Sequence, residues 1–329
     1  MSASFPKTDW IWRDGEFVRW EDATLHVMSH VVHYGSSIIE GIRSYDTPDG
    51  PAIFRLGAHV RRFYESCLIY RMKPTPTPDE MSAACHELME RNGLKDCYLR
   101  PVAYRGVGAA GLYPMASPVH TVIVTWPWGS YLGAGALEQG VDVRVSSWTR
   151  SAPNTFPAMA KSVANYANSG LIKMEAVLEG YSEGIALNAD GHLSEGSGQN
   201  LFLVRDEILF TPPISASVLP GITRDTVMTL ARDLGFDVRE QALPREMLYV
   251  ADEMFFCGTA VEITPIRSVD KVAVGAGTRG PVTAALQQAF FDYINGAVPD
   301  RHRWLEHVDI PSTKREPAGA ASGAGARKP

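Results

Sequence analysis

The chain has 329 residues, of which 45% are hydrophobic and 21% are charged, and its formal net charge is −6. This balance is ordinary for a globular enzyme, and the length suits two domains better than one. An acidic chain lacks the basic face needed to bind nucleic acid or an anionic membrane surface, so we expect neither partner. No run approaches the roughly 20 apolar residues that a transmembrane helix needs.

The N-terminal residues and the cysteines favour a cytoplasmic location. The first 17 residues contain no basic segment followed by an apolar one, as a secretory signal would require. The four cysteines are scattered and form no CxxC pair; they are Cys67, Cys85, Cys97 and Cys257. We therefore expect reduced thiols, with neither a disulfide framework nor a metal site.

The first part of the chain, residues 1–127, predicts a small α/β domain. The Asp14-Gly15 pair between two apolar runs predicts a β-hairpin. Apolar residues at helical spacing predict amphipathic helices over 56–72 and 78–94. Two strand-like runs follow, at 97–104 and 120–126.

Residues 128–134, which are rich in Gly and aromatic side chains, predict a linker to a larger β-rich domain over 135–310. In that domain we expect hairpins that turn at Asp190-Gly191 and Asp206-Glu207, and helices over 220–235 and 281–296. The segment 311–329 is a low-complexity mixture of Ala, Gly, Pro, Lys and Arg, and it predicts a disordered tail.

Lys161 lies in an unusual stretch, 151-SAPNTFPAMAKSVANYANSG-170, with no acidic residue among the ten that precede it. Most lysines lie on solvated surfaces among other charges. Small uncharged neighbours disfavour the ammonium form and leave an amine that can act as a nucleophile. The chemistry typical of such an amine is a Schiff base with a carbonyl, either of a substrate or of pyridoxal phosphate.

A pyridoxal-phosphate site needs an acidic partner for the pyridine nitrogen and hydrogen-bond donors for the phosphate. Glu195, which lies among Gly and Ser residues, is a candidate for the first role. The stretch 220-PGIT-223 comes directly before a predicted helix, so Ile222 and Thr223 offer amides and a hydroxyl to the phosphate. Each feature alone also fits an ordinary loop or helix start.

A second phosphate-binding segment is 257-CGTA-260, where Gly permits close approach and Thr259 carries a hydroxyl. A cation would complete the site. Arg62 and its neighbour Arg61 fit that role equally well by pattern alone.

Six blocks together resemble the branched-chain amino-acid aminotransferases, which are class IV (fold type IV) pyridoxal-phosphate enzymes. The resemblance runs from about Trp10 to Val308. It implies a smaller α/β domain and a larger pseudo-barrel domain with the cofactor between them, in a homodimer or larger homo-oligomer whose partner loops close the site. The blocks are 29-SHVVHYGSSIIEGIRSY-45, 98-YLRPVAY-104, 157-PAMAKSVANY-166, 194-SEGSGQNLF-202, 219-LPGITRD-225 and 258-GTAVEITPI-266.

The resemblance implies a role for each matching residue of the cofactor site. Lys161 would be the Schiff-base lysine and proton shuttle, Tyr166 would hydrogen-bond the cofactor's phenolic oxygen, and Glu195 would pair with the pyridine nitrogen. Alignment with the family prefers Arg62 to Arg61. The phosphate would be held by Arg62, Ile222, Thr223 and Thr259.

The resemblance also implies a substrate site for amino acids and keto acids. The Thr259-Ala260 turn would receive the substrate carboxylate, and Arg100 would suit the second carboxylate of glutamate or 2-oxoglutarate. The remaining lining residues would be Tyr34, Ile39, Tyr98, Trp128 and Tyr131.

Two departures from the family pattern leave the donor open. Ile39 stands where branched-chain members usually carry phenylalanine, and Ala110 stands where a larger residue is common. The first hypothesis is transamination of branched-chain L-amino acids with 2-oxoglutarate, which Tyr98 and Arg100 favour. The alternative within the fold is a transaminase of (R)-amines or D-amino acids. A class IV aminodeoxychorismate lyase and a binding protein without catalysis fit less well.

Overall fold

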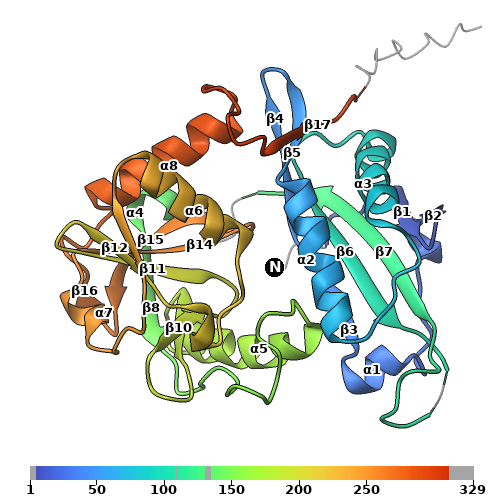
Figure 1. Ribbon diagram of the computed structural model, residues 1–329, viewed down its shortest axis with the longest axis horizontal. Coiled ribbons are helices and arrows are strands. Elements are labelled where there is room, and N and C mark those ends of the chain that lie inside the picture. The colour runs from blue at the N-terminus through green and yellow to red at the C-terminus, as the bar shows by residue number, and fades with distance from the viewer. Residues whose placement is uncertain (1–4, 109, 130–134, 311–329) are drawn as a thin grey trace, which may run out of the picture.

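The computed structural model describes residues 5–108, 110–129 and 135–310. The chain forms two β-sheets that lie side by side, each with its own helices (Figure 1). The N-terminal residues, blue to green, build the sheet on the right, and later residues build the sheet on the left. This mixture of helices and sheets confirms the predicted α/β (α+β) class.

The first sheet has the strand order β17-β5-β4-β6-β7-β1-β2, and β3 pairs with β6. The strands are β1 (Trp10–Arg13), β2 (Glu16–Arg19), β3 (Ser37–Ile39), β4 (Ile42–Thr47), β5 (Gly50–Phe54), β6 (Cys97–Arg105), β7 (Val119–Pro127) and β17 (Leu305–His307). The helices of this part are α1 (His30–Tyr34), α2 (Leu56–Ile69) and α3 (Pro78–Asn92). The hairpin at Asp14-Gly15, the two helices and the two strands predicted here are all confirmed.

Local signals explain where α3 begins and ends. Thr77 caps the helix through a reciprocal pair of hydrogen bonds with Glu80, and Pro78 occupies the first helical turn. Gly93 ends the helix with φ at +61°, a left-handed conformation that costs glycine little. The apolar faces of α2 and α3 then pack on the first sheet, where Phe63 and Leu88 are fully buried.

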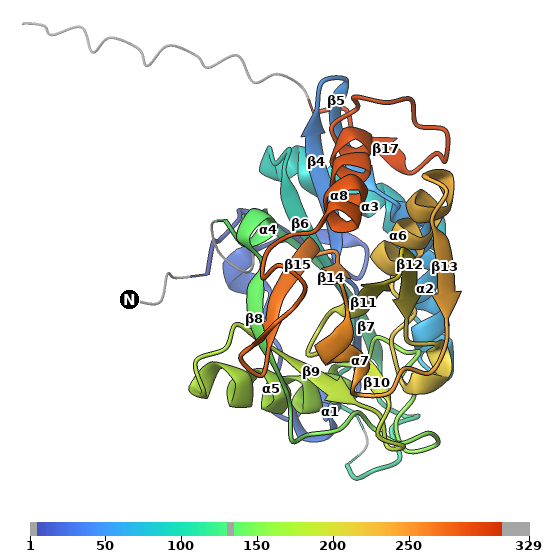
Figure 2. The same ribbon diagram turned by 90° about the vertical axis from the view of Figure 1, so that its left-hand side faces the viewer.

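The second sheet has the strand order β10-β9-β8-β15-β14-β11-β12-β13, and β16 pairs with β15. Its strands are β8 (Val141–Val145), β9 (Glu183–Leu187), β10 (Leu193–Gly196), β11 (Asn200–Arg205), β12 (Ile208–Thr211), β13 (Asp237–Glu240), β14 (Glu253–Gly258), β15 (Glu262–Val269) and β16 (Val272–Ala273). Its helices are α4 (Ala136–Gln139), α5 (Val163–Leu178), α6 (Ile222–Asp233), α7 (Met247–Val250) and α8 (Pro281–Ile294). Figure 2 shows α6 and α8 beside the strands and α5 along the lower edge.

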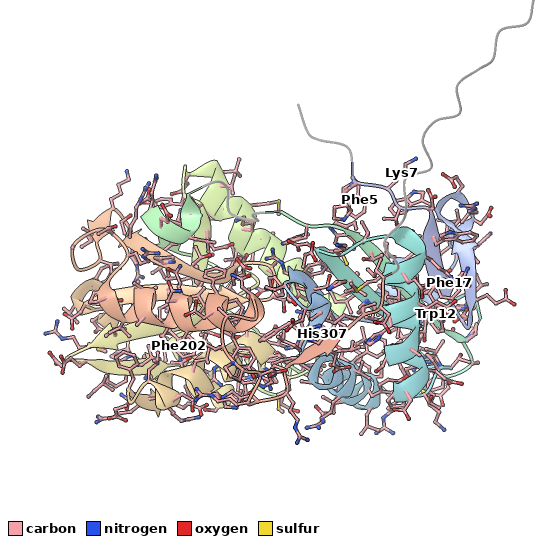
Figure 3. The ribbon with its side chains drawn as sticks, turned by 90° about the horizontal axis from the view of Figure 1, so that it is seen from above. Phe5, Lys7, Trp12, Phe17, Phe202 and His307 are labelled. Atoms are coloured by element: carbon pink, nitrogen blue, oxygen red, sulfur yellow. The ribbon has the colours of Figure 1, made fainter. Side chains whose placement is uncertain are left out.

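The strand β11 shows why this sheet is buried on both faces. Side chains alternate along a strand, so Leu201 and Leu203 join one apolar cluster while Phe202 and Val204 join another, which includes α6 and α8. The second cluster also contains Phe54 of the first sheet. Figure 3 shows Phe202 and Trp12 in the two separate parts of the molecule.

Both predicted hairpins of the second part and both predicted helices are confirmed, but α5 was not predicted. Its first half contains Asn, Ser and Gly, which are weak helix formers, and only Ser169, Ile172 and Ala176 are buried on it. The sequence therefore lacks a clear apolar stripe there. Tertiary contact with β9 stabilises this helix in place of a strong pattern.

The proposed domain limits at 127 and 135 stay a prediction. The strand β17 falls within the range expected to form the larger domain, and it pairs with β5 of the first sheet. Most of the expected linker and the tail 311–329 lie outside the described residues. None of the described helices is both long enough and apolar enough to cross a membrane.

Candidate functional site

A pocket is lined by residues from both parts of the molecule. The first sheet and α2 contribute Gly41, Arg62, Tyr98 and Arg100. The second part contributes side chains from the segments around 150–169, 195–200, 217–223 and 257–261. Each of the six sequence blocks quoted above therefore contributes at least one residue to the lining of this pocket.

The pocket is positively charged although the protein as a whole is acidic. A cleft lined by charges of one sign concentrates ligands of the opposite sign. The lining therefore favours anionic ligands such as phosphate esters and carboxylates. The charged residues that line it are the cations Arg62, Arg100, Arg150 and Lys161 and the carboxylate of Glu195.

Lys161 is held in the pocket wall by its backbone. Its amide donates to the Ser66 hydroxyl at 3.1 Å, and its carbonyl accepts from the Ile39 amide at 3.0 Å. The next residue, Ser162, caps α5 by accepting from the Ala164 amide. The lysine thus stands at the junction of α2, β3 and α5, and its side chain is partly buried.

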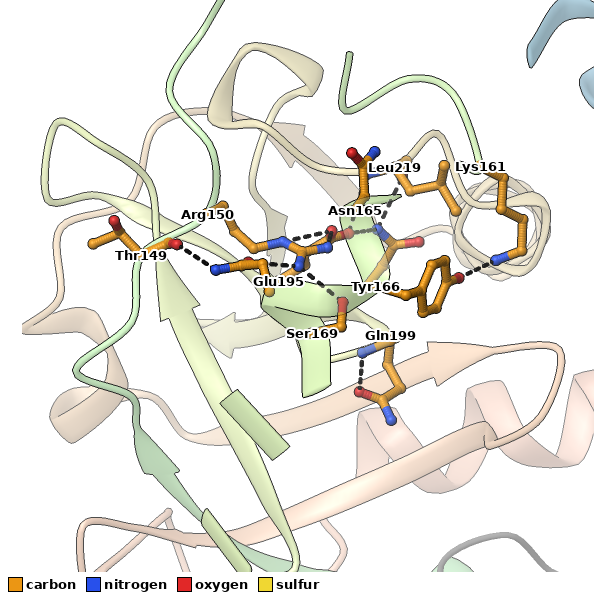
Figure 4. Close-up of polar contacts among 12 residues, drawn as sticks. Thr149, Arg150, Lys161, Asn165, Tyr166, Ser169, Glu195, Gln199 and Leu219 are labelled. Atoms are coloured by element: carbon orange, nitrogen blue, oxygen red, sulfur yellow. Dashed lines mark hydrogen bonds and ion pairs between the residues drawn. The ribbon is translucent and has the colours of Figure 1, made fainter. Parts of the chain in front are cut away.

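The amine of Lys161 meets the hydroxyl of Tyr166, with 2.6 Å between Nζ and Oη (Figure 4). Burial alone raises the pKa of Tyr166, but the cations of Lys161, Arg62 and Arg100 outweigh it and lower the pKa overall. The tyrosine oxygen therefore carries more negative character than usual, which suits a hydrogen bond with a protonated amine.

Glu195 is 3% exposed, and its two carboxylate oxygens are held by different partners. Arg150 donates to one oxygen, with its Nε at 3.1 Å. Asn200 Nδ2 at 3.1 Å and the Leu219 amide at 3.0 Å donate to the other. Arg150 is itself held by the Ser169 hydroxyl at 3.0 Å (Figure 4). A buried carboxylate that accepts hydrogen bonds from a cation and several other donors is fixed in orientation.

The start of α6 presents free amides to the pocket. The first intrahelical hydrogen bond runs from the Asp225 amide to the Gly221 carbonyl, so the amides of Ile222 and Thr223 have no partner within the helix. A Cβ at Gly221 would lie 1.9 Å from Asn200 Oδ1, so a side chain there would displace Asn200, which donates to Glu195. Together with the helix dipole, these amides form an anion-binding site.

Arg62 points toward the start of α6, where its Nη1 donates to the Pro220 carbonyl at 3.0 Å. Its Nε and Nη2 donate to Glu40 at 2.7 and 2.8 Å. His59 donates to the same carboxylate at 2.8 Å. Burial raises the pKa of Glu40, but Arg62 and His59 more than reverse this and hold it well below its ordinary range. Arg61 is exposed and does not line the pocket.

The residues predicted for the substrate fall into two groups. Tyr98, Arg100 and Trp128 line the pocket with Thr259 and Ala260. The rings of Tyr98 and Trp128 pack at 4.6 Å between centroids, and Arg100 Nε is buried without a hydrogen-bond partner among the described residues. Such a donor is available to a ligand.

The second group does not line the pocket formed by this chain. Tyr34 lies on α1 and is 46% exposed, and Ile39 is buried in β3 behind the lysine. Ala110 is exposed. Tyr131 lies outside the described residues.

Sequence reasoning missed several side chains that hold the site. Glu40 and Asn200 lie inside two of the quoted blocks, so their place beside Arg62 and Glu195 could have been suspected. Ser66 and Arg150 have no local signal. Ser66 contacts Lys161, 95 positions away along the chain, and Arg150 contacts Glu195, 45 positions away. Only the fold brings these pairs together.

Comparisons with known proteins agree with this geometry. A family model described as amino-transferase class IV matches residues 37–269. The branched-chain-amino-acid aminotransferase of Escherichia coli (strain K12) is 52% identical over 304 residues, covering 92% of this chain and 98% of that protein. The chain superimposes on a crystal structure of the Escherichia coli enzyme with a TM-score of 0.91, at 51% identity, covering 92% of this chain and 100% of the other.

A crystal structure of the branched-chain amino acid aminotransferase from Thermobaculum terrenum in its PLP-form (holo-form) is also similar. Its TM-score is 0.85 at 34% identity, and the match covers 92% of this chain and 99% of that one. These matches span nearly the whole described chain, and they confirm the resemblance inferred from the six blocks. The chain belongs to the class IV aminotransferase family.

Proposed function

We propose that the protein transfers the amino group of branched-chain L-amino acids (Leu, Ile and Val) to 2-oxoglutarate, with pyridoxal 5'-phosphate as its cofactor. The observation that carries this proposal is the contact of Lys161 with Tyr166 inside a cationic pocket that also contains Glu195 and the start of α6. The similarity to enzymes named branched-chain-amino-acid aminotransferases supports the same reaction.

The residues present fit this cofactor. The free amides at the start of α6, the Thr223 hydroxyl and the guanidinium of Arg62 suit a phosphate. Thr259, which lines the same pocket, offers a second hydroxyl. Glu195 is buried, is held in place by Arg150 and is suited to pair with a pyridine nitrogen. When bound, the cofactor supplies an electrophilic carbon that binds the amino group and a ring that accepts the electron pair left at the substrate's α-carbon.

Lys161 would act as a nucleophile and as a general base. Nζ of Lys161 would accept the proton that leaves the substrate's α-carbon and would later give that proton back, while the bound cofactor would hold the electron pair. Tyr166 would keep Nζ in place during this transfer, because its oxygen accepts a hydrogen bond from Nζ at 2.6 Å. Its hydroxyl would also face the cofactor's phenolic oxygen. The second half of the cycle runs in reverse with the keto acid.

Arg100 would bind the second carboxylate of glutamate and 2-oxoglutarate, since its Nε is buried in the pocket and has no partner among the described residues. Tyr98 and Trp128 form an aromatic wall beside it that suits a branched aliphatic side chain. The amides of Thr259 and Ala260 would bind the α-carboxylate that every substrate carries.

A homodimer or larger homo-oligomer is part of the proposal. The helix α1 and the loop that follows β6 are adjacent, because the His30 ring nitrogen contacts the Gly111 carbonyl at 3.2 Å. Residues 28–34, which include α1, and this loop expose large apolar side chains, which marks a surface for a partner. Light scattering on the purified protein should give at least twice the mass of the chain. The exposed residues are Met28, Val32, Tyr34, Val107, Leu112 and Tyr113.

We also propose that the protein acts in the cytoplasm. All four cysteines are free and buried, which fits a reducing compartment. Activity assays on fractions of the source cells should find the enzyme with the cytoplasmic proteins.

The proposed function is tested by a panel of donors with 2-oxoglutarate as acceptor. Initial rates on L-leucine, L-isoleucine and L-valine should exceed those on D-alanine and (R)-1-phenylethylamine by at least about 100-fold, which is about 2.7 kcal/mol of transition-state discrimination. Near-zero activity on L-leucine with turnover of either of the last two would replace the proposal with the alternative. Pyruvate release without a keto-acid acceptor would indicate a lyase.

A further inference from the structure

Arg43 and Glu262 form an ion pair between the two sheets, although neither residue lines the pocket. Arg43 lies on β4 of the first sheet, and Glu262 is the first residue of β15 in the second. Their Nη1 and Oε1 atoms are 2.9 Å apart, and each side chain is 11% exposed. The pair is therefore largely shielded from water, unlike an ordinary surface salt bridge.

Tyr45 adds to the same contact. Its hydroxyl donates to Glu262 Oε1 at 3.3 Å, and its ring lies under the guanidinium of Arg43 with 4.8 Å to the centroid. The ring itself belongs to the apolar cluster that spans both sheets. Arg43 and Tyr45, which both lie on β4, thus bind the carboxylate of Glu262 together.

The backbone of Glu262 is in a conformation that favours glycine. Its φ is +54°, in the left-handed region where a side chain adds strain. Asn or Gly would adopt this conformation at lower cost. Glutamate, unlike glycine, supplies a carboxylate that reaches Arg43. The ion pair therefore offsets the backbone strain at this position.

The residues beside the pair belong to the pocket. Gly258 and Glu262 are paired across β14 and β15, and they enclose the turn 259–261, which the Val261 amide closes on the Gly258 carbonyl at 3.2 Å. All three turn residues line the pocket.

On the first sheet, Arg43 is paired in register with Tyr98, which also lines the pocket. Tyr98 packs closely on Gly41, where a Cβ would lie 1.9 Å from the tyrosine oxygen. The ion pair therefore links the turn of one sheet to an aromatic wall that belongs to the other.

We propose that Arg43 and Glu262 are positioning residues that set the turn 259–261 at the correct distance from Tyr98, so that its amides meet the substrate carboxylate. The inference rests on the proposed function, because it assigns that turn to carboxylate binding. The two residues act through the turn and touch neither substrate nor cofactor. If the ion pair only stabilised the contact between the sheets, its loss would lower the stability of the protein and leave substrate affinity unchanged.

The test uses Glu262→Gly in the holoenzyme. Glycine relieves the left-handed backbone and removes the carboxylate, so it separates the two contributions of Glu262. We expect the Kd of 4-methylvaleric acid, a carboxylate without an amino group, to rise about 10-fold by spectral titration, a typical loss for one charged contact. KM for L-leucine should rise similarly, and kcat should change less than about threefold.

Arg43→Met should produce the same increase, and the double variant should be no worse than either single one, because both remove one shared contact. Arg267→Met is the matched control. Arg267 lies on the same strand as Glu262 and pairs with Asp142 away from the pocket, so its loss should leave the Kd unchanged. Glu262→Gln replaces the glycine variant if that variant does not fold.

An unchanged Kd in Glu262→Gly would overturn the inference, as would a Kd that rises equally in Arg267→Met. A lower melting temperature with unchanged Kd and KM would show that the ion pair contributes to stability alone. Failure of the proposed function is distinguishable, because the unmodified enzyme would then not act on L-leucine at all.

Discussion

The amine of Lys161 and the hydroxyl of Tyr166 are 2.6 Å apart at the start of α5. The lysine immediately precedes the helix cap, and the tyrosine follows within the first turns, so the helix itself sets their spacing. Burial raises the pKa of Tyr166, and the surrounding cations lower it by more. The Tyr166 oxygen is therefore a good hydrogen-bond acceptor for Lys161 Nζ and holds that amine in one place.

Tyr166→Phe should lower kcat by about 10- to 100-fold, because it removes a hydrogen bond to a charged group worth about 1.5–3 kcal/mol. The cofactor should remain bound, since its phosphate contacts are untouched. Steady-state rates on L-leucine and the visible absorption of the purified variant measure both effects. A kcat within twofold of the unmodified enzyme would contradict this role.

Arg150→Met should weaken cofactor binding by about 10-fold or more, because it leaves the buried Glu195 without its cation at a cost of about 1.5–3 kcal/mol. The dissociation constant of the cofactor follows from titration of the apoenzyme. Arg144→Met is the matched control, since Arg144 pairs with Glu175 and does not line the pocket. Equal losses in both variants would indicate a general effect on stability.

Arg100→Met should raise KM for 2-oxoglutarate and L-glutamate by about 10- to 100-fold, since it removes one charged hydrogen bond from the second carboxylate. KM for L-leucine, which has no second carboxylate, should change much less. If all three constants rose together, Arg100 would contact a group that every substrate shares.

The cluster of Glu40, His59 and Arg62 predicts that stability falls in acid. The pKa of Glu40 is lowered from 4.5 in the folded protein, because Arg62 and His59 outweigh the effect of burial, so its contribution is present above 4.5 and is lost as pH falls below that value. Burial also lowers the pKa of His59 from 6.5, so the unfolded state binds more protons below that pH. Both effects act in the same direction.

The melting temperature should therefore fall as the pH is lowered from 7.5 to 4, beginning near 6.5. His59→Gln should flatten the upper part of this curve. Glu40→Gln should destabilise the protein at pH 7 by about 3–5 kcal/mol, because it leaves Arg62 buried without its partner. A melting temperature that is constant between pH 7.5 and 5 would contradict the assignment.

Local sequence signals predicted most elements and part of the site. The capping residues Thr77 and Gly93 and the turn pairs Asp14-Gly15 and Asp190-Gly191 act over a few positions, so a reader of the sequence can see them. The helix α5 escaped because its stability comes from contact with β9. No pattern in one chain reveals such a contact.

Residues of the site differ in the same way, because some carry a local sequence signal and others depend on contacts made only in the fold. Lys161 stood out through its own neighbours, and Ile222 and Thr223 through the helix that follows them. Arg150 could not be predicted, because its partner Glu195 lies 45 positions away along the chain and only the fold brings the two together. Tyr34 is exposed on α1, away from the pocket lining, and its proposed contact with substrate requires a second copy of the chain.

The measurement that tests the account most directly compares the unmodified enzyme with Lys161→Ala. After reduction with borohydride, peptide mapping of the unmodified enzyme should find the cofactor attached to Lys161. The Lys161→Ala variant should transaminate L-leucine at least about 10⁴-fold more slowly than the unmodified enzyme, as expected when a single group serves as both nucleophile and base. Attachment at another lysine, or a variant that retains a tenth of the rate, would contradict the assignment of Lys161 and the function built on it.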